Sequence, residues 1–274
     1  MKLNFQKMHL LGNDFVITET IRQAFTPTPA LIKSWADRKT GIGFDQFLLI
    51  EKPCQQNTHF HYRIFNADGQ EVSQCGNGAL CVAQFLLTEQ LTTANPIRLT
   101  TKNSQLVLQL TKKGQVTATL GIPIIKTNDL NSPLHHLSTP LGSVDAYILS
   151  LGNPHCVLPV QQLDTAPVAY LGQYFNQPPQ SLFPTGTNVA FVEITTPQQI
   201  KLRVYERGAG ETRACGSGAC AAVIAGRLMK QLDSQVNVQL PGGTLTVCWP
   251  GPNQAVSLTG QGTQVFQGTI RPLT

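Results

Sequence analysis

The sequence contains one pattern twice, and this duplication constrains the fold more than any other feature. Residues 65–79 align without a gap with residues 205–219, and each copy carries a cysteine followed by Gly-x-Gly-Ala, at Cys75 and Cys215. Three further pairs of segments recur in the same order, displaced by 140 to 142 positions: 11–16 and 151–157, 45–51 and 187–193, and 116–119 and 256–259. Blocks that keep their order and spacing indicate two copies of one structural unit.

Each copy predicts several short strands and one buried helix. Runs of β-branched or alternating residues between Gly, Pro and Asn, such as 47–50, 106–110 and 236–240, predict strands. An apolar segment follows each cysteine, at 79–91 and 219–232, and its first turns are apolar nearly all round. Such a helix must be buried on every side. We therefore expect an α/β (α+β) fold with two pseudosymmetric domains, each a mixed β-sheet barrel wrapped around a central helix, with the copies facing each other about a pseudo-twofold axis.

The length also favours two domains. A chain of 274 residues is longer than a typical single domain. The segment 122–142 lies between the copies and holds three prolines, which predicts a connection or an edge segment. We assign residues 1–117 plus 263–274 to an N-terminal domain and residues 118–262 to a C-terminal domain.

Composition and charge exclude several classes of protein. Hydrophobic residues make up 41% of the chain and charged residues 13%, which is typical of a globular protein rather than a disordered one. The net charge of +5 comes from scattered Lys and Arg without a basic cluster, so we expect no nucleic-acid partner. The sequence has no signal-peptide pattern and no 18-residue apolar stretch. We expect a cytoplasmic protein without a membrane partner.

The cysteines and histidines do not predict a metal centre or a disulfide scaffold. Seven cysteines are an odd number, and none of them forms a paired Cys-x-x-Cys zinc motif. His59 and His61 alternate along a strand-like run, but no third ligand has suitable spacing. We expect no metal, and we interpret five of the cysteines as small core residues: 54, 81, 156, 220 and 248.

Cys75 and Cys215 differ from the others because a glycine-rich helix start follows each of them. Backbone N–H groups in the first turn of a helix have no partner within the helix, and the helix dipole is positive there. This setting is expected to lower a thiol pKa and to attract an anion, such as a substrate carboxylate that glycines allow to approach closely. Fixed N–H donors would stabilise the charge that such a carboxylate gains when its α-proton leaves.

Inversion at an α-carbon requires a base on one face and an acid on the other. Two pseudosymmetric cysteines supply both, one as thiolate and one as thiol, with their roles exchanged in the reverse reaction. Because the two groups are coupled, the sequence gives neither cysteine a separate pKa. Two alternatives are an inert buried cysteine in each copy and a redox pair that forms a disulfide on oxidation. The duplication favours the acid-base function.

With these elements in place, the chain resembles the diaminopimelate epimerase family over essentially its whole length. The motifs that carry the resemblance are 7–9, 11–15, 43–46, 65–69, 75–79, 152–155, 187–188, 206–208 and 214–218. Leu10 departs from the family pattern, which usually has glycine beside the first loop. The resemblance implies interconversion of LL- and meso-2,6-diaminopimelate without pyridoxal phosphate or metal, in lysine and peptidoglycan precursor synthesis. It also implies a homodimer and two domains that close over the substrate.

The resemblance assigns further residues to a substrate with an amino-acid group at each end. Asn13 and Gln46 would contact the reacting end, and the amides of Gly76, Asn77, Gly216 and Ser217 would bind the reacting carboxylate. Glu206 would meet an ammonium group. Four residues would hold the distal carboxylate, in part through a bidentate guanidinium: Asn66, Asn153, Asn188 and Arg207. His155 and Glu206 are candidates for tuning a cysteine, and for His155 a purely structural hydrogen bond is the alternative.

Two other functions remain open from the sequence alone. One is a related cofactor-independent racemase that acts on proline or hydroxyproline through the same cysteine pair. The polar residues available for a second amino-acid head group argue against it. The other is a thiol-based redox or binding protein.

Overall fold

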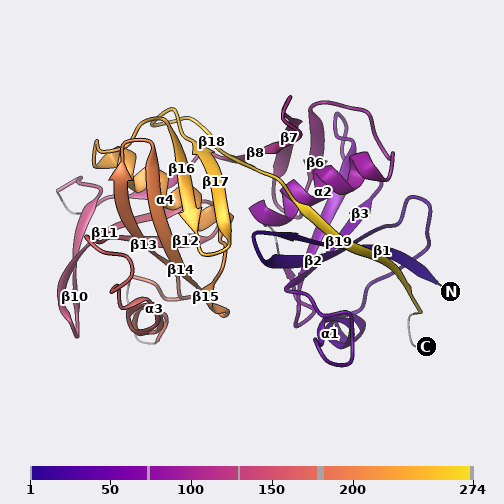
Figure 1. The fold of residues 1–274 in the computed structure, drawn as a ribbon, viewed down its shortest axis with the longest axis horizontal. Helices are drawn as coiled ribbons and strands as arrows, with labels where there is room; N and C mark the ends of the chain where they lie inside the picture. The colour runs from indigo at the N-terminus through magenta and orange to yellow at the C-terminus, as the bar shows by residue number, and fades with distance from the viewer. Residues whose placement is uncertain (1, 73–74, 129, 178–181, 272–274) are drawn as a thin grey trace. The chain divides into compact units, whose positions relative to one another are not determined.

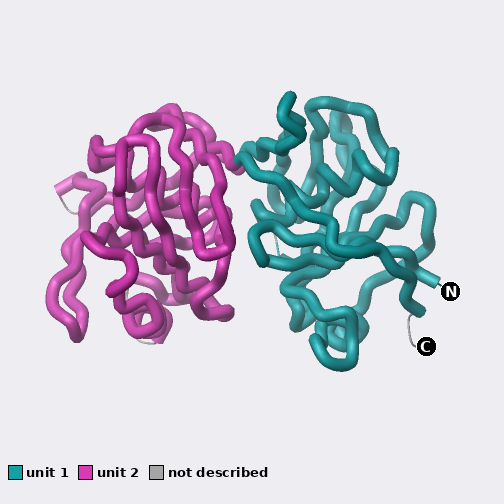
Figure 2. Tube along the Cα trace, viewed as in Figure 1, with its two compact units in different colours: residues 1–119, 259–274 teal, residues 120–258 magenta. Residues whose placement is uncertain are grey.

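The computed structural model describes residues 2–72, 75–128, 130–177 and 182–271. The chain separates into two compact units, and Figure 2 draws them in different colours. Unit 1 contains residues 1–119 and 259–274, and unit 2 contains residues 120–258. The expected domain limits, 117/118 and 262/263, lie within four residues of the limits between these units. That the units are separate domains stays a prediction.

Unit 1 is a curled sheet around one long helix (Figure 1). Strand β2 runs parallel to β3, β3 is antiparallel to β4, and β4 is parallel to β6. The elements are β1 (Leu3–Leu10), β2 (Asn13–Glu19), α1 (Pro29–Ala36), β3 (Gln46–Glu51), β4 (Phe60–Asn66), β5 (Glu71–Val72), α2 (Gly76–Thr88), β6 (Ile97–Thr100), β7 (Gln105–Leu110), β8 (Val116–Gly121) and the C-terminal β19 (Thr263–Ile270).

Unit 2 repeats this arrangement. Strand β12 runs parallel to β13, β13 is antiparallel to β14, and β14 is parallel to β16. Its elements are β9 (Ile124–Lys126), β10 (Leu134–Thr139), β11 (Gly142–Ser150), β12 (Pro154–Pro159), α3 (Val168–Asn176), β13 (Asn188–Thr196), β14 (Gln199–Glu206), β15 (Gly210–Thr212), α4 (Gly216–Leu228), β16 (Gln235–Leu240), β17 (Gly243–Cys248) and β18 (Val256–Gly260). The limits between the units, at 119/120 and 258/259, fall within β8 and β18. The segment 122–142, expected as a connection or edge, contributes β9 and β10, which both pair with β11.

The same ion pair braces the hairpin before each cysteine. Arg63 donates two hydrogen bonds to Glu71, at 3.1 and 2.8 Å, and Arg203 donates two to Glu211, at 2.7 and 3.0 Å. The two pairs lie 140 residues apart, the displacement of the sequence repeat. The predicted duplication and fold class are confirmed, down to the side chains that hold β4 to β5 and β14 to β15.

The central helices α2 and α4 are almost entirely buried. Helix α2 packs against β1, β2 and β7, and α4 packs against β11–β14 and β17. Nine residues of α2 and ten of α4 are buried, as the apolar sequence predicts. Among the described residues, the structure contains no helix with the length and apolar character needed to cross a membrane.

Both helices begin three residues earlier than the predicted limits of 79 and 219. The carbonyl groups of Cys75 and Cys215 accept hydrogen bonds from Ala79 and Ala219, at 3.0 and 2.9 Å, so the helix starts directly after each cysteine. Each helix also ends earlier than predicted, because Gln90 and Lys230 adopt positive φ angles of 54° and 60° that close the last turn. Neither residue is a glycine, so the sequence did not mark these ends.

Candidate active site

Cys75 is the N-cap residue of α2. Its backbone is extended, with φ −149° and ψ 101°, and its sulfur accepts a hydrogen bond of 3.2 Å from the amide of Gly78. The side chain is half-buried. The thiol therefore lies at the positive end of the helix dipole and beside the amides of the first turn, as the sequence predicted.

Cys215 occupies the equivalent position at the start of α4, but it faces a different partner. Its backbone is also extended, with φ −130° and ψ 106°, and the residue is buried. The thiol donates a hydrogen bond of 3.2 Å to Oε2 of Glu206, and Oε1 of the same carboxylate accepts a bond of 2.5 Å from the Thr212 hydroxyl. A carboxylate at the end of β14 thus holds the proton on the Cys215 sulfur.

These surroundings raise the pKa of the Cys215 thiol well above its ordinary range. Burial is the largest cause, and the charge of Glu206 is the next, while the Gly218 amide and the Ser217 hydroxyl act in the opposite direction. The expectation that the helix terminus would lower the pKa of this thiol is wrong for Cys215. Desolvation and a neighbouring negative charge outweigh the helix dipole, so Cys215 is protonated near neutral pH.

In unit 1, a line of hydrogen bonds leads from charged loop residues to the first turn of α2. Asn77 donates to Oδ1 of Asn13 at 3.1 Å, and Asn13 in turn donates to Asp45 at 2.9 Å. Arg38 binds the same Asp45 carboxylate at 2.8 Å. The amide of Asn13 is therefore held in one orientation by an ion pair, with its oxygen directed at α2. Sequence reasoning assigned no role to Asp45 or Arg38.

Gln46 and Asn66 lie opposite each other on the neighbouring strands β3 and β4. Gln46 donates to Oδ1 of Asn66 at 3.0 Å. Within the described residues, Oε1 of Gln46 is buried and has no hydrogen-bond partner. The family resemblance assigns these two residues to opposite ends of the substrate, which stays a prediction, and in unit 1 their side chains form one polar group.

Unit 2 contains a similar chain of hydrogen bonds, with Asn153 in the position that Asn13 has in unit 1. Asn153 donates to the Ser217 hydroxyl at 3.2 Å, and that hydroxyl lies 3.8 Å from the Cys215 sulfur. Nε2 of His155 bonds to Oδ1 of Asn153 at 3.0 Å. Burial, with a smaller contribution from the charge of Arg207, lowers the pKa of His155 to about 3. His155 is neutral and orients Asn153. Asn153 in turn contacts the Ser217 hydroxyl, which lies beside the Cys215 sulfur.

Asn188 and Arg207 lie together at the ends of β13 and β14. The backbone amide of Arg207 donates to Oδ1 of Asn188 at 3.0 Å. Its guanidinium donates from Nη1 to the carbonyl of Thr185 at 3.1 Å, and the residue is exposed. The hydrogen bond to Thr185 fixes one side of the exposed Arg207 guanidinium. Thr185 and Thr212 carried no sequence signal as site residues.

The remaining cysteines are not all core residues. Cys81, Cys156 and Cys220 are buried, and burial raises the pKa of each thiol above its ordinary range. Cys248 is half-buried. The interpretation is wrong for Cys54, which is exposed and lies 3.4 Å from Nδ1 of His61. The described residues contain no group of three His, Cys, Asp or Glu side chains placed to hold a metal ion.

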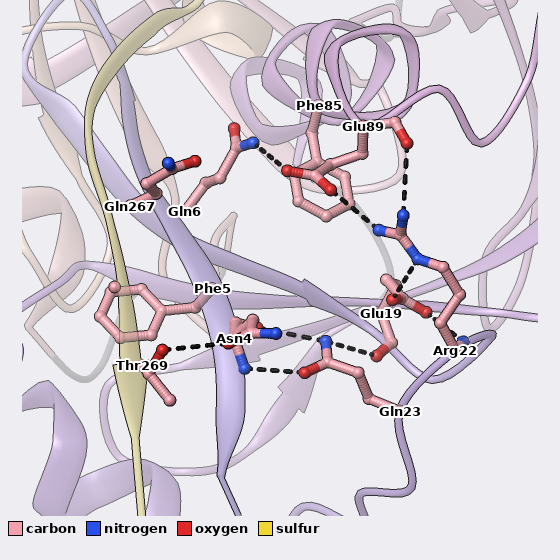
Figure 3. A pocket seen from close by; sticks show the side chains of 11 residues that line it. Asn4, Phe5, Gln6, Glu19, Arg22, Gln23, Phe85, Glu89, Gln267 and Thr269 are labelled. Atoms are coloured by element: carbon pink, nitrogen blue, oxygen red, sulfur yellow. Dashed lines mark hydrogen bonds and ion pairs between the residues drawn. The ribbon is translucent and has the colours of Figure 1, made fainter.

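A pocket of about 600 Å³ in unit 1 is separate from these residues. Figure 3 shows Arg22 between Glu19 and Glu89, with ion pairs of 3.0 and 2.8 Å. Glu89 also accepts a bond of 2.7 Å from Gln6. The charged groups that line the pocket are thus paired with one another, and neither cysteine lines it.

Solved structures share this fold at low sequence identity. A phenazine biosynthesis protein of the PhzF family from Bacillus anthracis is 14% identical with a TM-score of 0.76, and the match covers 99% of each chain. A hydroxyproline epimerase from Agrobacterium vitis is also 14% identical, with a TM-score of 0.73 over 98% of this chain and 92% of that chain. At this identity the likeness shows the fold alone.

The sequence comparisons identify the family. The family model described as diaminopimelate epimerase matches residues 5–125 and 147–265. A protein from Azotobacter vinelandii named diaminopimelate epimerase is 44% identical over 277 residues, which is 99% of this chain and 100% of that protein. Together with the fold, these matches define an isomerase of the racemase and epimerase class. The chain belongs to the diaminopimelate epimerase family.

We predict that Glu206→Gln lowers the pKa of Cys215, because it removes the negative charge that disfavours the thiolate. Burial remains, so the pKa stays above the ordinary cysteine value. The rate at which iodoacetamide alkylates Cys215, followed by mass spectrometry from pH 7 upward, should rise at lower pH in the variant.

Glu211→Gln is the matched control for this measurement, since Glu211 lies in the same unit but bonds to Arg203. It should leave the alkylation profile of Cys215 unchanged. A Glu206→Gln profile identical to that of the unsubstituted protein would show that the carboxylate does not hold this proton.

Proposed function

We propose that this chain interconverts LL-2,6-diaminopimelate and meso-2,6-diaminopimelate by two-base proton transfer through Cys75 and Cys215. The observation that carries the proposal is a cysteine at the N-terminus of a buried helix in each copy, one of them held as a thiol by Glu206. In this proposal the chain uses no pyridoxal phosphate and no metal. The reaction would serve lysine and peptidoglycan precursor synthesis.

The proposed chemistry begins with removal of the α-proton by one cysteine as thiolate. The substrate carboxylate gains charge as the proton leaves, and the first-turn amides of α2 and α4 would stabilise that charge: those of Gly76, Asn77, Gly216 and Ser217. The other cysteine, as thiol, then delivers a proton to the opposite face. Because Cys215 is protonated beside Glu206, it would act as the acid in one direction, with Cys75 as the base.

The same residues account for the reverse direction. After one turnover, Cys75 carries the proton and Cys215 is a thiolate beside the Glu206 carboxylate. That arrangement places two negative charges together, so the Cys215 thiolate would be a strong base. It can take a proton from the product isomer or from solvent. The role of Glu206 as a cysteine-tuning residue is thus supported by its contact with Cys215.

The rest of the substrate would be held by the polar groups of both units. Arg207 is exposed and anchored on one side by Thr185, so its guanidinium can form a bidentate pair with the distal carboxylate. Asn66, Asn153 and Asn188 would complete that end, and Asn13 and Gln46 would contact the reacting end. Glu206, whose carboxylate accepts hydrogen bonds from Cys215 and Thr212, would meet a substrate ammonium.

A cytoplasmic homodimer is part of the proposal. Strand β19 pairs with β1, and its adjacent apolar residues Val265 and Phe266 are 55% and 45% exposed. Exposed apolar residues next to each other on one strand are suited to a contact with a second copy. We expect neither nucleic acid nor membrane as a partner.

The substrate assignment is tested by incubating the protein with LL-diaminopimelate in metal-free buffer. We expect the meso isomer to form until the two isomers reach equilibrium, as measured by chiral chromatography. L-proline and trans-4-hydroxy-L-proline, under the same conditions, should not be epimerised. Turnover of the imino acids alone would instead favour the proline racemase alternative.

Replacing either reacting cysteine should stop the reaction. We expect Cys75→Ala and Cys215→Ala each to reduce kcat by about 1000-fold or more, since acid-base groups typically contribute factors of 100 to 10,000. Cys→Ser variants should retain traces of turnover, because a hydroxyl is a poorer base. The matched control is Cys54→Ala, an exposed thiol whose loss should leave kcat unchanged. An active Cys75→Ala/Cys215→Ala double variant would refute the two-cysteine mechanism.

Sedimentation velocity tests the oligomeric state. The protein should sediment with about twice the 29.8 kDa mass of one chain. Phe266→Asp should shift it to the single-chain mass, because a charge replaces an apolar contact. Leu141→Asp, at another exposed apolar position, is the control and should not change the mass. A single-chain mass for the unsubstituted protein would contradict the dimer.

A further inference from the structure

Tyr62 is a buried tyrosine whose hydroxyl has no use in the packing of unit 1. It lies on β4 with no exposed surface, and within the described residues its oxygen has no hydrogen-bond partner. A buried polar group without a partner destabilises the folded protein, so most such groups are paired. A phenylalanine would fill the same space without this penalty. The hydroxyl therefore calls for an explanation outside packing.

The hydroxyl lies beside the first turn of α2, close to Cys75. A Cβ placed on Gly78 would be 2.5 Å from the Tyr62 oxygen and 3.2 Å from the Cys75 sulfur. Since these two distances add to 5.7 Å, the oxygen and the sulfur are no farther apart than that. Gly78 is thus the residue whose missing side chain lets the tyrosine approach the cysteine.

The second copy shows that the fold does not require a hydroxyl here. The position 140 residues after Tyr62 is Leu202, which is fully buried on β14. The three heavy atoms nearest to a Cβ on Gly218 would be carbon and sulfur atoms of Val204 and Cys215, at 3.1 to 3.3 Å. The two copies thus surround their cysteines differently: a hydroxyl lies near Cys75, and the carboxylate of Glu206 accepts from Cys215.

Tyr62 can act only as a hydrogen-bond donor to a charged sulfur. Burial, followed by the negative charges that Cys75 and Cys81 would carry, raises the pKa of Tyr62 well above its ordinary value. Cys81, the other titratable group that faces Tyr62, stays a neutral thiol because burial raises its pKa as well. The phenol therefore keeps its proton at every pH at which the enzyme would work, and it cannot serve as a base.

We propose that Tyr62 is a positioning residue that donates its hydroxyl hydrogen to the Cys75 thiolate and favours the charged form of that cysteine. The hydroxyl rotates freely about its C–O bond, and hydrogen bonds of catalytic groups often shorten only when substrate is bound. This role rests on the function proposed above, in which Cys75 is a base. In this role, Tyr62 is a hydrogen-bond donor for Cys75, whereas Glu206 is a hydrogen-bond acceptor for Cys215.

Tyr62→Phe tests the proposal, because it removes one oxygen and preserves the ring. The pH dependence of Cys75 alkylation by iodoacetamide, located by tandem mass spectrometry, reports the pKa of that thiol. We expect the pKa of Cys75 to rise by about one unit, a tenfold change in its ionisation constant. The acidic limb of the kcat/KM profile for diaminopimelate should move to higher pH by the same amount, while the melting temperature should not fall.

Two further variants make the result decisive. Tyr147→Phe removes the hydroxyl of a buried tyrosine in unit 2 and should leave both profiles unchanged. Fluorotyrosine introduced at position 62 makes the phenol a stronger donor and should lower the pKa of Cys75 instead of raising it. An unchanged Cys75 pKa in both position-62 variants would overturn the proposal.

The alkylation readout requires no substrate, so it separates this proposal from the proposed function. A shifted Cys75 pKa in a protein that does not epimerise diaminopimelate would support the role of Tyr62 and reject the substrate. Normal epimerisation with an unshifted pKa would support the substrate and reject the role of Tyr62.

Discussion

The first turn of an α-helix presents backbone N–H groups that have no acceptor within the helix. In this chain, two helices buried inside curled sheets both begin at such a turn directly after a cysteine. The amide of Gly78 donates to the sulfur of Cys75, and each first turn contains two glycines. The surrounding structure holds these two turns in place. An ion pair braces the hairpin before each turn, and an asparagine side chain, Asn13 or Asn153, forms a hydrogen bond to a residue of the turn. Each copy thereby places a thiol beside the backbone amides of a first turn.

The two copies share the position of the cysteine before the helix, but they differ in several residues around it. Glu206, which holds the proton of Cys215, has Asn66 at the equivalent position of the first copy. Tyr62 has Leu202 as its counterpart, and His155 has Phe15.

An asparagine nevertheless binds the residue two positions after the cysteine in both copies, through Asn13 to Asn77 and Asn153 to Ser217. This hydrogen bond is therefore common to both copies, whereas the groups that lie near each sulfur differ. Such an asymmetry suits a pair in which one cysteine must be charged while the other is neutral.

The sequence was sufficient for those features that the repeat itself encodes. Matching blocks predicted the two copies, and the apolar runs after Cys75 and Cys215 predicted the central helices. The early helix ends at Gln90 and Lys230 escaped prediction, because these residues take left-handed backbone conformations without being glycine.

Protonation and partner choice depend on contacts that sequence spacing does not reveal. The position of Cys215 at a helix N-terminus predicted a lowered thiol pKa, but burial and the nearby Glu206 raise that pKa. Tyr62 gave no signal, since the sequence does not show that its hydroxyl lies near Gly78 and Cys75. Cys54 carried no mark that separates an exposed thiol from a core one.

We propose that two thiol groups, those of Cys75 and Cys215, exchange protons with the α-carbon, rather than one. The most direct test of this proposal is early-time isotope partition in D₂O, starting from unlabelled LL-diaminopimelate and analysing both isomers by mass spectrometry before the reaction approaches equilibrium. With two bases, deuterium should enter the meso product at the inverted carbon, while the recovered LL substrate stays unlabelled. Deuterium appearing in the LL substrate faster than meso product forms would show a single base that returns its proton to the same face, and would contradict the two-cysteine account.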